Sequence, residues 1–315
     1  MKPGEKTMMS SGLAHLRSWC RQARYYSRMC GQWLARDSKS CPYCNSTAVT
    51  VLCRKRFFVR RMLCERCRLE YRHPKDRETF SSNFRSPRAP CDISQRELQA
   101  FLDSNFVGSR YDFSADIQIV RRLVPLGRVL VYGASFGSAV HQLRAAGYET
   151  IGFEIDQARV EYGRRHLGVE ICADLQALES MACHFDVIHA THVLEHITDI
   201  GRILRLFGSI IRPQGLLYVR VPNCTRTAST DLDGTWGTHL GDSHVLALTK
   251  EFFLRNLPAH GFTPSVHACD GGRYDLDLIV STAGRLYVDE SEGGELLIVA
   301  THSGTSKGQL EGLSG

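Results

Sequence analysis

The sequence contains no span of about 18 apolar residues, the length that a membrane-crossing helix requires. We also find no segment typical of a secretory signal peptide. The 12 cysteines would indicate disulfides in a secreted protein, but without such signals we expect reduced thiols. With 315 residues, the chain is long enough for one large hydrophobic core and a small additional module. These features are typical of a cytoplasmic enzyme.

The complete G-x-G-x-x-G fingerprint of the dinucleotide-binding folds is also missing. In its place, Gly133, Ser135 and Gly137 follow residues 128–132, an apolar, β-branched run that suits a parallel strand covered on both faces. Glycines let the backbone bend tightly and approach a ligand, and residues 138–146 then predict a helix. The segment therefore predicts a strand, a ligand-binding turn and a helix.

A carboxylate stands at the end of the next predicted strand. Residues 150–153 are mostly apolar and are followed by Glu154. In a doubly wound sheet the carboxyl ends of the first two strands lie side by side, so Glu154 would face the glycine turn. A carboxylate in that place can accept hydrogen bonds from both ribose hydroxyls. We therefore expect a site for an adenine nucleoside.

Two other interpretations of the glycine turn are open. A strand, the motif G-x-S-x-G and a helix also make the nucleophile elbow of the α/β-hydrolases, with Ser135 as the nucleophile. That fold needs an upstream oxyanion loop of the HGGG kind, which the sequence lacks. A structural turn that binds no ligand is the other alternative. Glu154 favours the nucleoside site over both.

The segments downstream continue the alternation of strand and helix. Residues 185–190 and 216–221 predict two further strands, and residues 199–211 predict a helix between them. Three short motifs accompany these elements: Leu194-Glu195-His196, Pro213-Gln214-Gly215 and Val221-Pro222-Asn223. With these motifs, residues 128–262 resemble the class I S-adenosylmethionine (SAM) dependent methyltransferases. The resemblance implies an α/β fold with a Rossmann-like, seven-stranded sheet.

The resemblance also assigns a cofactor site. Its residues would be Gly133, Ala134, Ser135, Gly137, Glu154, Asp174 and His192. The glycine turn would pack against the methionine part of SAM, Glu154 would hold the ribose, and Asp174 would lie beside the adenine. Two of these residues depart from the family pattern. Ser135 replaces the usual middle glycine, and Glu154 is one methylene longer than the usual aspartate.

Residues 192–196 also match H-x-x-E-H, the inverted zincin motif. In a zincin the two histidines ligate zinc from one face of a long helix, whereas here the motif follows a predicted strand. We therefore expect Glu195 and His196 to shape a pocket wall, or a histidine to act as general base. The candidates for this base are His192, His196, His239 and His244. His244 is favoured because it follows the predicted substrate loop that contains Trp236.

Four cysteines form two C-x2-C pairs, Cys41 with Cys44 and Cys64 with Cys67, separated by 19 residues. Each pair places two thiolates on one tight turn, and four thiolates complete the tetrahedron of a structural zinc site. The segment between the pairs predicts strands around a basic turn, with Cys53 as an additional cysteine. We therefore predict a zinc-ribbon-like module. A ribbon before a methyltransferase domain resembles bacterial enzymes that methylate sugars and related natural products.

The predicted domains follow from these motifs. They are a basic extension at 1–40, the ribbon at 41–74, a linker and helical lid at 75–126, the methyltransferase domain at 127–302 and a disordered tail at 303–315. In the lid, Ser94 and Glu97 form a capping box that predicts a helix at 94–103. Residues 275–294 have no place in this scheme. The net charge of +6 lies largely before residue 90, so it describes the extension and the ribbon.

The sequence thus predicts a SAM-dependent methyltransferase that acts on a small-molecule acceptor, such as a sugar or a natural product. The motif Asn/Asp-Pro-Pro-Tyr, which marks many amino-methylating nucleic-acid enzymes, does not follow residues 185–190. Two alternatives are an RNA methyltransferase and a catalytically degenerate fold that binds nucleic acid or a partner through the basic N-terminal region. No motif specifies whether oxygen, nitrogen or carbon receives the methyl group.

Overall fold

The structure is a computed structural model, and it describes residues 23, 25–34, 38–55, 59–75, 93–225, 240, 244–270, 273–289 and 293–304. Some predictions lie outside the described residues: the role of His239, the loop around Trp236, and most of the basic extension and of the tail. The described part holds one sheet of eight strands and one of four.

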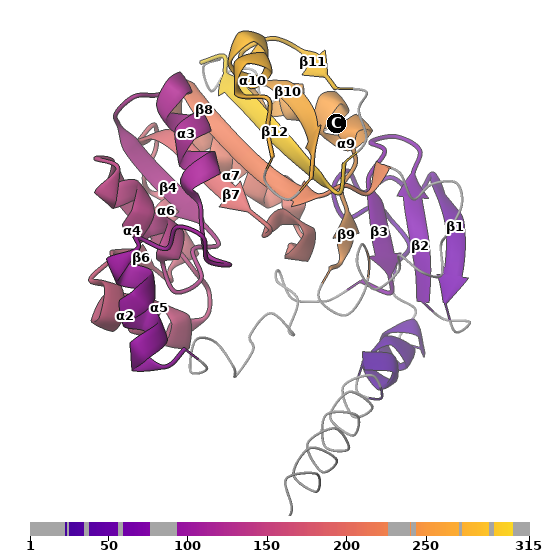
Figure 1. Cartoon of the computed structure of the whole chain (residues 1–315). Coiled ribbons are helices and arrows are strands. Elements are labelled where there is room, and N and C mark those ends of the chain that lie inside the picture. The colour runs from indigo at the N-terminus through magenta and orange to yellow at the C-terminus, as the bar shows by residue number, and fades with distance from the viewer. Residues whose placement is uncertain are drawn as a thin grey trace, which may run out of the picture.

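The larger sheet has the strand order β11-β10-β12-β8-β7-β4-β5-β6. Its strands are β4 (Arg128–Tyr132), β5 (Glu149–Phe153), β6 (Ile171–Cys172), β7 (Phe185–Thr191), β8 (Ile211–Pro222), β10 (Phe262–Cys269), β11 (Tyr287–Val288) and β12 (Glu295–His302). The five strands from β6 to β8 run parallel, and β12 lies antiparallel between β8 and β10. This sheet, seen in Figure 1, confirms the predicted α/β, Rossmann-like architecture.

Helices cover both faces of the sheet. Successive residues of each strand point to opposite sides, so neighbouring side chains of one strand pack into different cores. Val129 and Val131 of β4 share one core with α3, α4 and α5, whereas Leu130 and Tyr132 share the other core with α6, α7 and α9. The helices are α2 (Gln95–Asp103), α3 (Ser114–Leu123), α4 (Ser138–Ala145), α5 (Gln157–Leu167), α6 (Leu175–Glu179), η1 (Leu194–His196), α7 (Ile200–Ile210), α9 (Lys250–Asn256), η3 (Leu257–His260) and α10 (Leu276–Thr282). Coverage on both faces explains the apolar runs of the central strands.

Several elements have the predicted bounds or close to them. β4 coincides with the predicted strand, and α2 begins at the predicted capping box. In that box the Glu97 N–H donates to the Ser94 hydroxyl at 3.2 Å, and the Ser94 N–H donates to the Glu97 carboxylate at 2.9 Å. The segment 275–294, which had no place in the predicted scheme, forms α10 and β11. Because β11 pairs with β10, this segment adds the eighth strand to the sheet.

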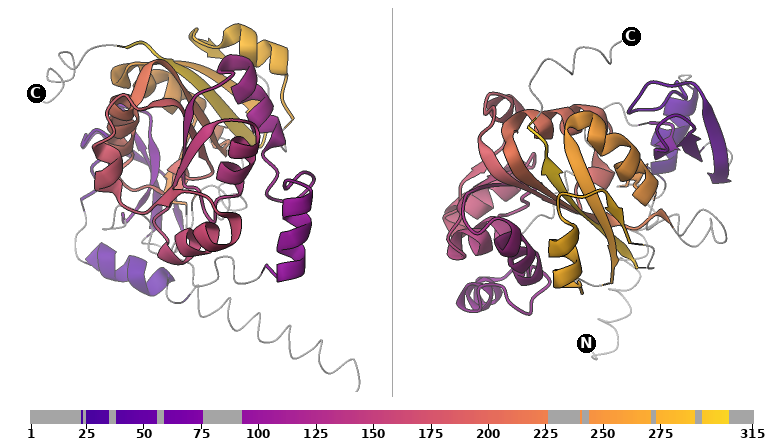
Figure 2. Two further views of the ribbon diagram at one scale, coloured as in Figure 1. Left: turned by 90° about the vertical axis from the view of Figure 1, so that its left-hand side faces the viewer. Right: turned by 90° about the horizontal axis from the view of Figure 1, so that it is seen from above.

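The smaller sheet is antiparallel and has the order β1-β2-β3-β9. β1 (Val49–Lys55), β2 (Val59–Cys64) and β3 (Glu70–His73) come from the predicted ribbon, but β9 (Leu246–Ala247) comes from the C-terminal half of the chain. In the register, Tyr71 pairs with Leu246. Figures 1 and 2 show the ribbon beside the larger sheet, with β9 at the junction. The ribbon and the larger domain therefore share a sheet.

Candidate active site and metal centre

The turn after β4 depends on backbone conformations that favour glycine. Gly133 has φ +78°, and a Cβ built on it would lie 2.6 Å from Val193 Cγ2, so any side chain would collide there. Ser135 has φ +51°, in the left-handed region that an L-residue adopts at a cost of about 1–2 kcal/mol. This geometry explains why a glycine is usual at the position of Ser135 in the family that the sequence resembles.

Glu154 follows β5 and lies against this turn. Its side chain is buried, and its two carboxylate oxygens accept hydrogen bonds from the N–H groups of Ser135 and Asp156, both at 2.9 Å. Burial raises the pKa of Glu154, whereas these hydrogen bonds and nearby Arg159 act to lower it. A carboxylate has about four acceptor positions, so about two remain for ligand hydroxyls.

A small pocket lies between the turn and the segment after β7. Gly133 and Glu154 line one part of it, and Val193 and His196 line another. The pocket therefore brings together the predicted ribose acceptor and one of the predicted histidines.

The other predicted cofactor residues lie around this pocket without lining it. Ala134 is buried, and a Cβ on Gly152 of β5 would lie 2.8 Å from its methyl group, so Ala134 packs closely on that strand. Asp174 caps α6, where its carboxylate accepts a hydrogen bond from the Gln176 N–H at 2.9 Å. The predicted contact of Asp174 with adenine stays a prediction.

Aromatic residues of the predicted lid pack on the same turn from the other side. The ring of Tyr111, which precedes α3, meets the ring of Phe136 edge-on at 4.9 Å between centroids. The Phe113 N–H donates a hydrogen bond to Gln142 of α4 at 2.9 Å. These contacts fix the segment before α3 against the glycine turn and the helix that follows it.

His192 is held between two carboxylates. Its Nε2 lies 2.7 Å from Oε1 of Glu295 on β12, and its Nδ1 lies 3.5 Å from Oε1 of Glu195. Burial acts to lower the pKa of His192, but the two carboxylates outweigh it and raise the pKa to about 9. The imidazole is therefore protonated at neutral pH, a state in which it cannot accept a proton. The sequence contained no signal for Glu295, because β12 joins the site only through the fold.

Glu195, His196 and His244 form a compact group at the end of the pocket. Their ligand atoms all lie within 4.8 Å of one another, and the rings of His196 and His244 meet at 4.7 Å between centroids. Glu195 and His196 belong to η1, a single 3-10 turn, so the H-x-x-E-H motif does not lie on a long helix. The zincin arrangement, with two histidines on one helical face, is therefore absent from this segment. The group combines two of the predicted base candidates with a buried carboxylate.

A buried polar cluster that the sequence did not predict lies under the lid. Asp116 of α3 accepts a hydrogen bond from the Tyr218 hydroxyl at 2.8 Å and lies 3.2 Å from Nη1 of Arg220 and 3.3 Å from Nε2 of His189. Burial would raise the pKa of Asp116, but His189 and Arg220 hold it below its usual value. His189 and Arg220 interrupt the apolar pattern of β7 and β8, and this interruption is the signal that could have indicated the cluster.

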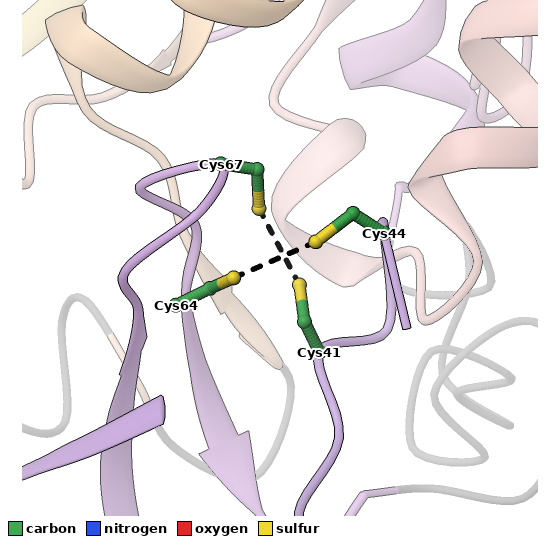
Figure 3. A group of neighbouring side chains, drawn as sticks. All are labelled: Cys41, Cys44, Cys64 and Cys67. Atoms are coloured by element: carbon green, nitrogen blue, oxygen red, sulfur yellow. Dashed lines mark hydrogen bonds between the residues drawn. The ribbon is translucent and has the colours of Figure 1, made fainter. Parts of the chain in front are cut away.

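The four cysteines of the ribbon lie together, as Figure 3 shows. Sγ of Cys41 is 3.4 Å from Sγ of Cys67, and Sγ of Cys44 is 3.5 Å from Sγ of Cys64, whereas a disulfide needs about 2.05 Å. Four sulfurs placed about 2.3 Å from a central zinc would be about 3.8 Å apart, so the group needs only a small outward shift to hold the ion. The hydrogen bond from Cys67 lowers the pKa of Cys41 to about 6, whereas burial raises the pKa of Cys44 to about 11. The donor set fits a structural zinc ion, which stays a prediction.

The cysteine centre contacts the larger domain directly. Nδ2 of Asn256 in α9 donates a hydrogen bond to the Cys67 carbonyl at 2.8 Å. The Tyr43 hydroxyl lies 2.9 Å from Nε2 of His260 in η3, and its ring meets that of Phe252 at 5.5 Å. The turns that carry the cysteines are therefore packed on α9 and η3. Among the described residues, no helix is both long enough and apolar enough to cross a membrane.

Comparisons with known proteins agree with this geometry. A family model described as a methyltransferase domain matches residues 94–264, just over half of the chain. The ubiquinone biosynthesis O-methyltransferase of Bradyrhizobium diazoefficiens is 30% identical over 185 residues, which cover 55% of this chain and 64% of that protein. The enzyme of the same name from Methylocella silvestris is 30% identical over 104 residues, 31% of this chain and 41% of that protein. The chain thus spans less than two thirds of the length of these relatives.

Two solved structures also match part of this chain, at lower sequence identity. A SAM-dependent methyltransferase from Archaeoglobus fulgidus is 17% identical, with a TM-score of 0.44, and the match covers 64% of this chain and 99% of that one. The YcgJ protein of Bacillus subtilis is 14% identical, with a TM-score of 0.45, and the match covers 61% of this chain and 99% of that one.

Proposed function

Because the chain belongs to the methyltransferase-domain family, we propose that it transfers the methyl group of SAM to an oxygen of a small-molecule acceptor. The observation that carries this proposal is the pocket that runs from Glu154 and the glycine turn to His196. The Glu154 carboxylate, which can hold the ribose, lines one part of this pocket, and the His196 imidazole lines another. Such a reaction needs both a cofactor site and a group that handles the acceptor proton.

In this proposal the glycine turn and Glu154 hold SAM. Glu154 would accept the ribose hydroxyls with the acceptor positions that its two backbone hydrogen bonds leave open. The bare backbone at Gly133 would let the methionine part approach β4 closely. Bound SAM supplies a sulfonium methyl group that is already activated, so the protein's task is to hold the acceptor in line with it and to exclude water.

The acceptor would lie at the end of the pocket where His196 and His244 meet. A hydroxyl acceptor must lose its proton as it is methylated, and an imidazole has a pKa suited to this task near neutral pH. His192 is less suited, since the carboxylates of Glu195 and Glu295 keep it protonated. The names of the relatives, O-methyltransferases, support oxygen as the methylated atom. A sugar or natural-product hydroxyl remains the predicted acceptor class.

Calorimetric titration of the purified chain with SAM tests the cofactor half of the proposal. We expect dissociation constants in the micromolar range, and mass spectrometry with a panel of hydroxylated acceptors should then detect O-methyl products. Absence of SAM binding, together with salt-sensitive binding of RNA, would instead favour a nucleic-acid-binding module on a methyltransferase fold. Ser135 supports this second candidate, because it places a side chain on the turn where the related enzymes have a glycine.

A further inference from the structure

We infer that Glu195, His196 and His244 form a divalent-cation site at the acceptor end of the pocket, separate from the four-cysteine centre. Two of the side chains come from η1 and the third, His244, lies two residues before β9, and their ligand atoms lie within 4.8 Å of one another. The inference deepens the proposed function and rests on it only for the identity of the acceptor; the cation itself can be tested without SAM.

Glu195 is the observation that points to a ligand. Its side chain is 3% exposed, and among the described residues neither of its carboxylate oxygens accepts a hydrogen bond. The nearest cationic group is His192, whose Nδ1 lies 3.5 Å from Oε1 of Glu195. The other ring nitrogen of His192 pairs with Glu295. Burying a carboxylate without hydrogen bonds is unfavourable, and a coordinated cation would remove that cost. The two imidazoles beside Glu195 are the other donors that such a cation needs.

The donor set indicates the kind of ion. Two imidazole nitrogens and one carboxylate oxygen are three protein ligands, the number found in catalytic metal sites that keep a position open for water or substrate. This combination suits borderline divalent ions such as Zn²⁺, Fe²⁺ or Co²⁺ better than Mg²⁺ or Ca²⁺, which prefer oxygen ligands. The four cysteines, by contrast, offer a closed set of thiolates. The two groups therefore differ in ligand type and in openness.

The position of the group gives the ion a role. His196 lines the pocket that also holds Glu154, so an ion on His196 would face the space between SAM and the acceptor. An acceptor hydroxyl on the open position would have a lowered pKa and would release its proton to water. The oxygen lone pair then forms the O–C bond to the methyl group while the C–S bond breaks, and the sulfonium becomes a neutral thioether. In this scheme His196 and His244 act as ligands, and the ion replaces a histidine base.

Metal analysis of the whole chain after dialysis against Zn²⁺ tests the inference. We expect two ions per chain in the wild type, and one in Glu195→Gln and in His244→Ala. Matched controls, Glu149→Gln on β5 and His166→Ala on α5, change exposed residues away from the group and should keep two. Circular dichroism establishes that each variant is folded, and Glu195→Gln preserves the size and shape of the side chain.

Turnover and cofactor affinity complete the experiment. Glu195→Gln and His244→Ala should lose at least about 100-fold in turnover and bind SAM with an affinity within about threefold of the wild type. One ion per chain in the wild type, with the same content in His244→Ala, would overturn the inference. If instead two ions are found and SAM does not bind, the cation site stands and the proposed function fails.

Discussion

The backbone N–H of Val245 donates a hydrogen bond to the carbonyl of Glu195 at 2.9 Å. The carbonyl of the same Val245 accepts a hydrogen bond from the N–H of Arg72 in β3 at 3.0 Å. One residue therefore connects β3 of the ribbon sheet to the turn that carries Glu195 and His196. His244 directly precedes it, so the ribbon helps to hold His244 against His196.

This connection predicts that the cysteine centre affects turnover. Cys64→Ser removes one thiolate from the centre, so it should lose the zinc ion of the ribbon and loosen β3 and β9. We expect turnover to fall about 10–100-fold, because small displacements of reacting groups are costly, while SAM affinity changes little. Zinc analysis and steady-state kinetics measure the two effects. The control is Cys53→Ser, a cysteine of β1 outside the four-cysteine group; full zinc content in Cys64→Ser would contradict the assignment.

Glu154→Gln tests the cofactor site. The amide keeps one oxygen as an acceptor but loses the negative charge, so SAM binding should weaken by about 1.5–3 kcal/mol, the range for charge-assisted hydrogen bonds. Calorimetry gives the dissociation constant, and Glu149→Gln at the start of β5 serves as the control because its side chain is exposed and pairs with Arg128. A dissociation constant unchanged by Glu154→Gln would remove Glu154 from the site.

His244→Ala tests the acceptor end of the pocket. We expect turnover to fall about 10²–10⁴-fold, whether the imidazole removes the acceptor proton or holds the cation that lowers its pKa. The SAM affinity should remain close to that of the wild type, since His244 does not line the pocket around Glu154. His239→Ala gives the comparison with the other predicted base on this part of the chain. Unchanged turnover in His244→Ala would exclude His244 both as the base and as a ligand of a cation that methyl transfer requires.

The parts of the site that could be predicted are those that local sequence determines. The glycine turn, Glu154 at the end of a strand and the two C-x2-C pairs each carry their signal within a few residues, and the fold places them as expected. The pairing of His192 with Glu295 could not be predicted, because 102 residues separate the two and only the antiparallel β12 brings them together. The same holds for β9, a two-residue strand whose pairing with the ribbon has no pattern of its own.

The cluster around Asp116 gives a prediction about stability. Asp116 is 1% exposed and faces Arg220. Burial acts to lower the pKa of Arg220, but the negative charge of Asp116 helps to keep that pKa high. Asp116→Ala would leave the Arg220 charge largely buried without its partner, so the free energy of unfolding should fall by about 3–5 kcal/mol. Urea denaturation measures this loss. Asp116→Asn, which keeps the acceptor for the Tyr218 hydroxyl, should lose less; equal stability of Asp116→Ala and the wild type would show that the cluster is not coupled to folding.

The buried His267 of β10 predicts how stability depends on pH. Its Nε2 lies 2.6 Å from the Ser265 hydroxyl and 3.3 Å from the Thr282 hydroxyl, and burial lowers the pKa to about 4, against a small opposing effect of Asp289 and Asp275. In the unfolded chain the pKa is about 6.5, so between these two values the unfolded chain binds the additional proton. The contribution of His267 is therefore complete above pH 6.5 and is lost as the pH falls towards 4.

Urea denaturation at pH 7 and at pH 4.5 checks this expectation in the wild type and in His267→Gln. The glutamine cannot take up a proton, so the variant should lose up to about 3 kcal/mol less stability than the wild type over this range. Other histidines with lowered pKa values, such as His260, remain in both proteins, so the difference between the two reports on His267 alone. Parallel loss of stability in the two proteins would mean that His267 is protonated in the folded state without cost, and its burial between Ser265 and Thr282 would then not control the acid response.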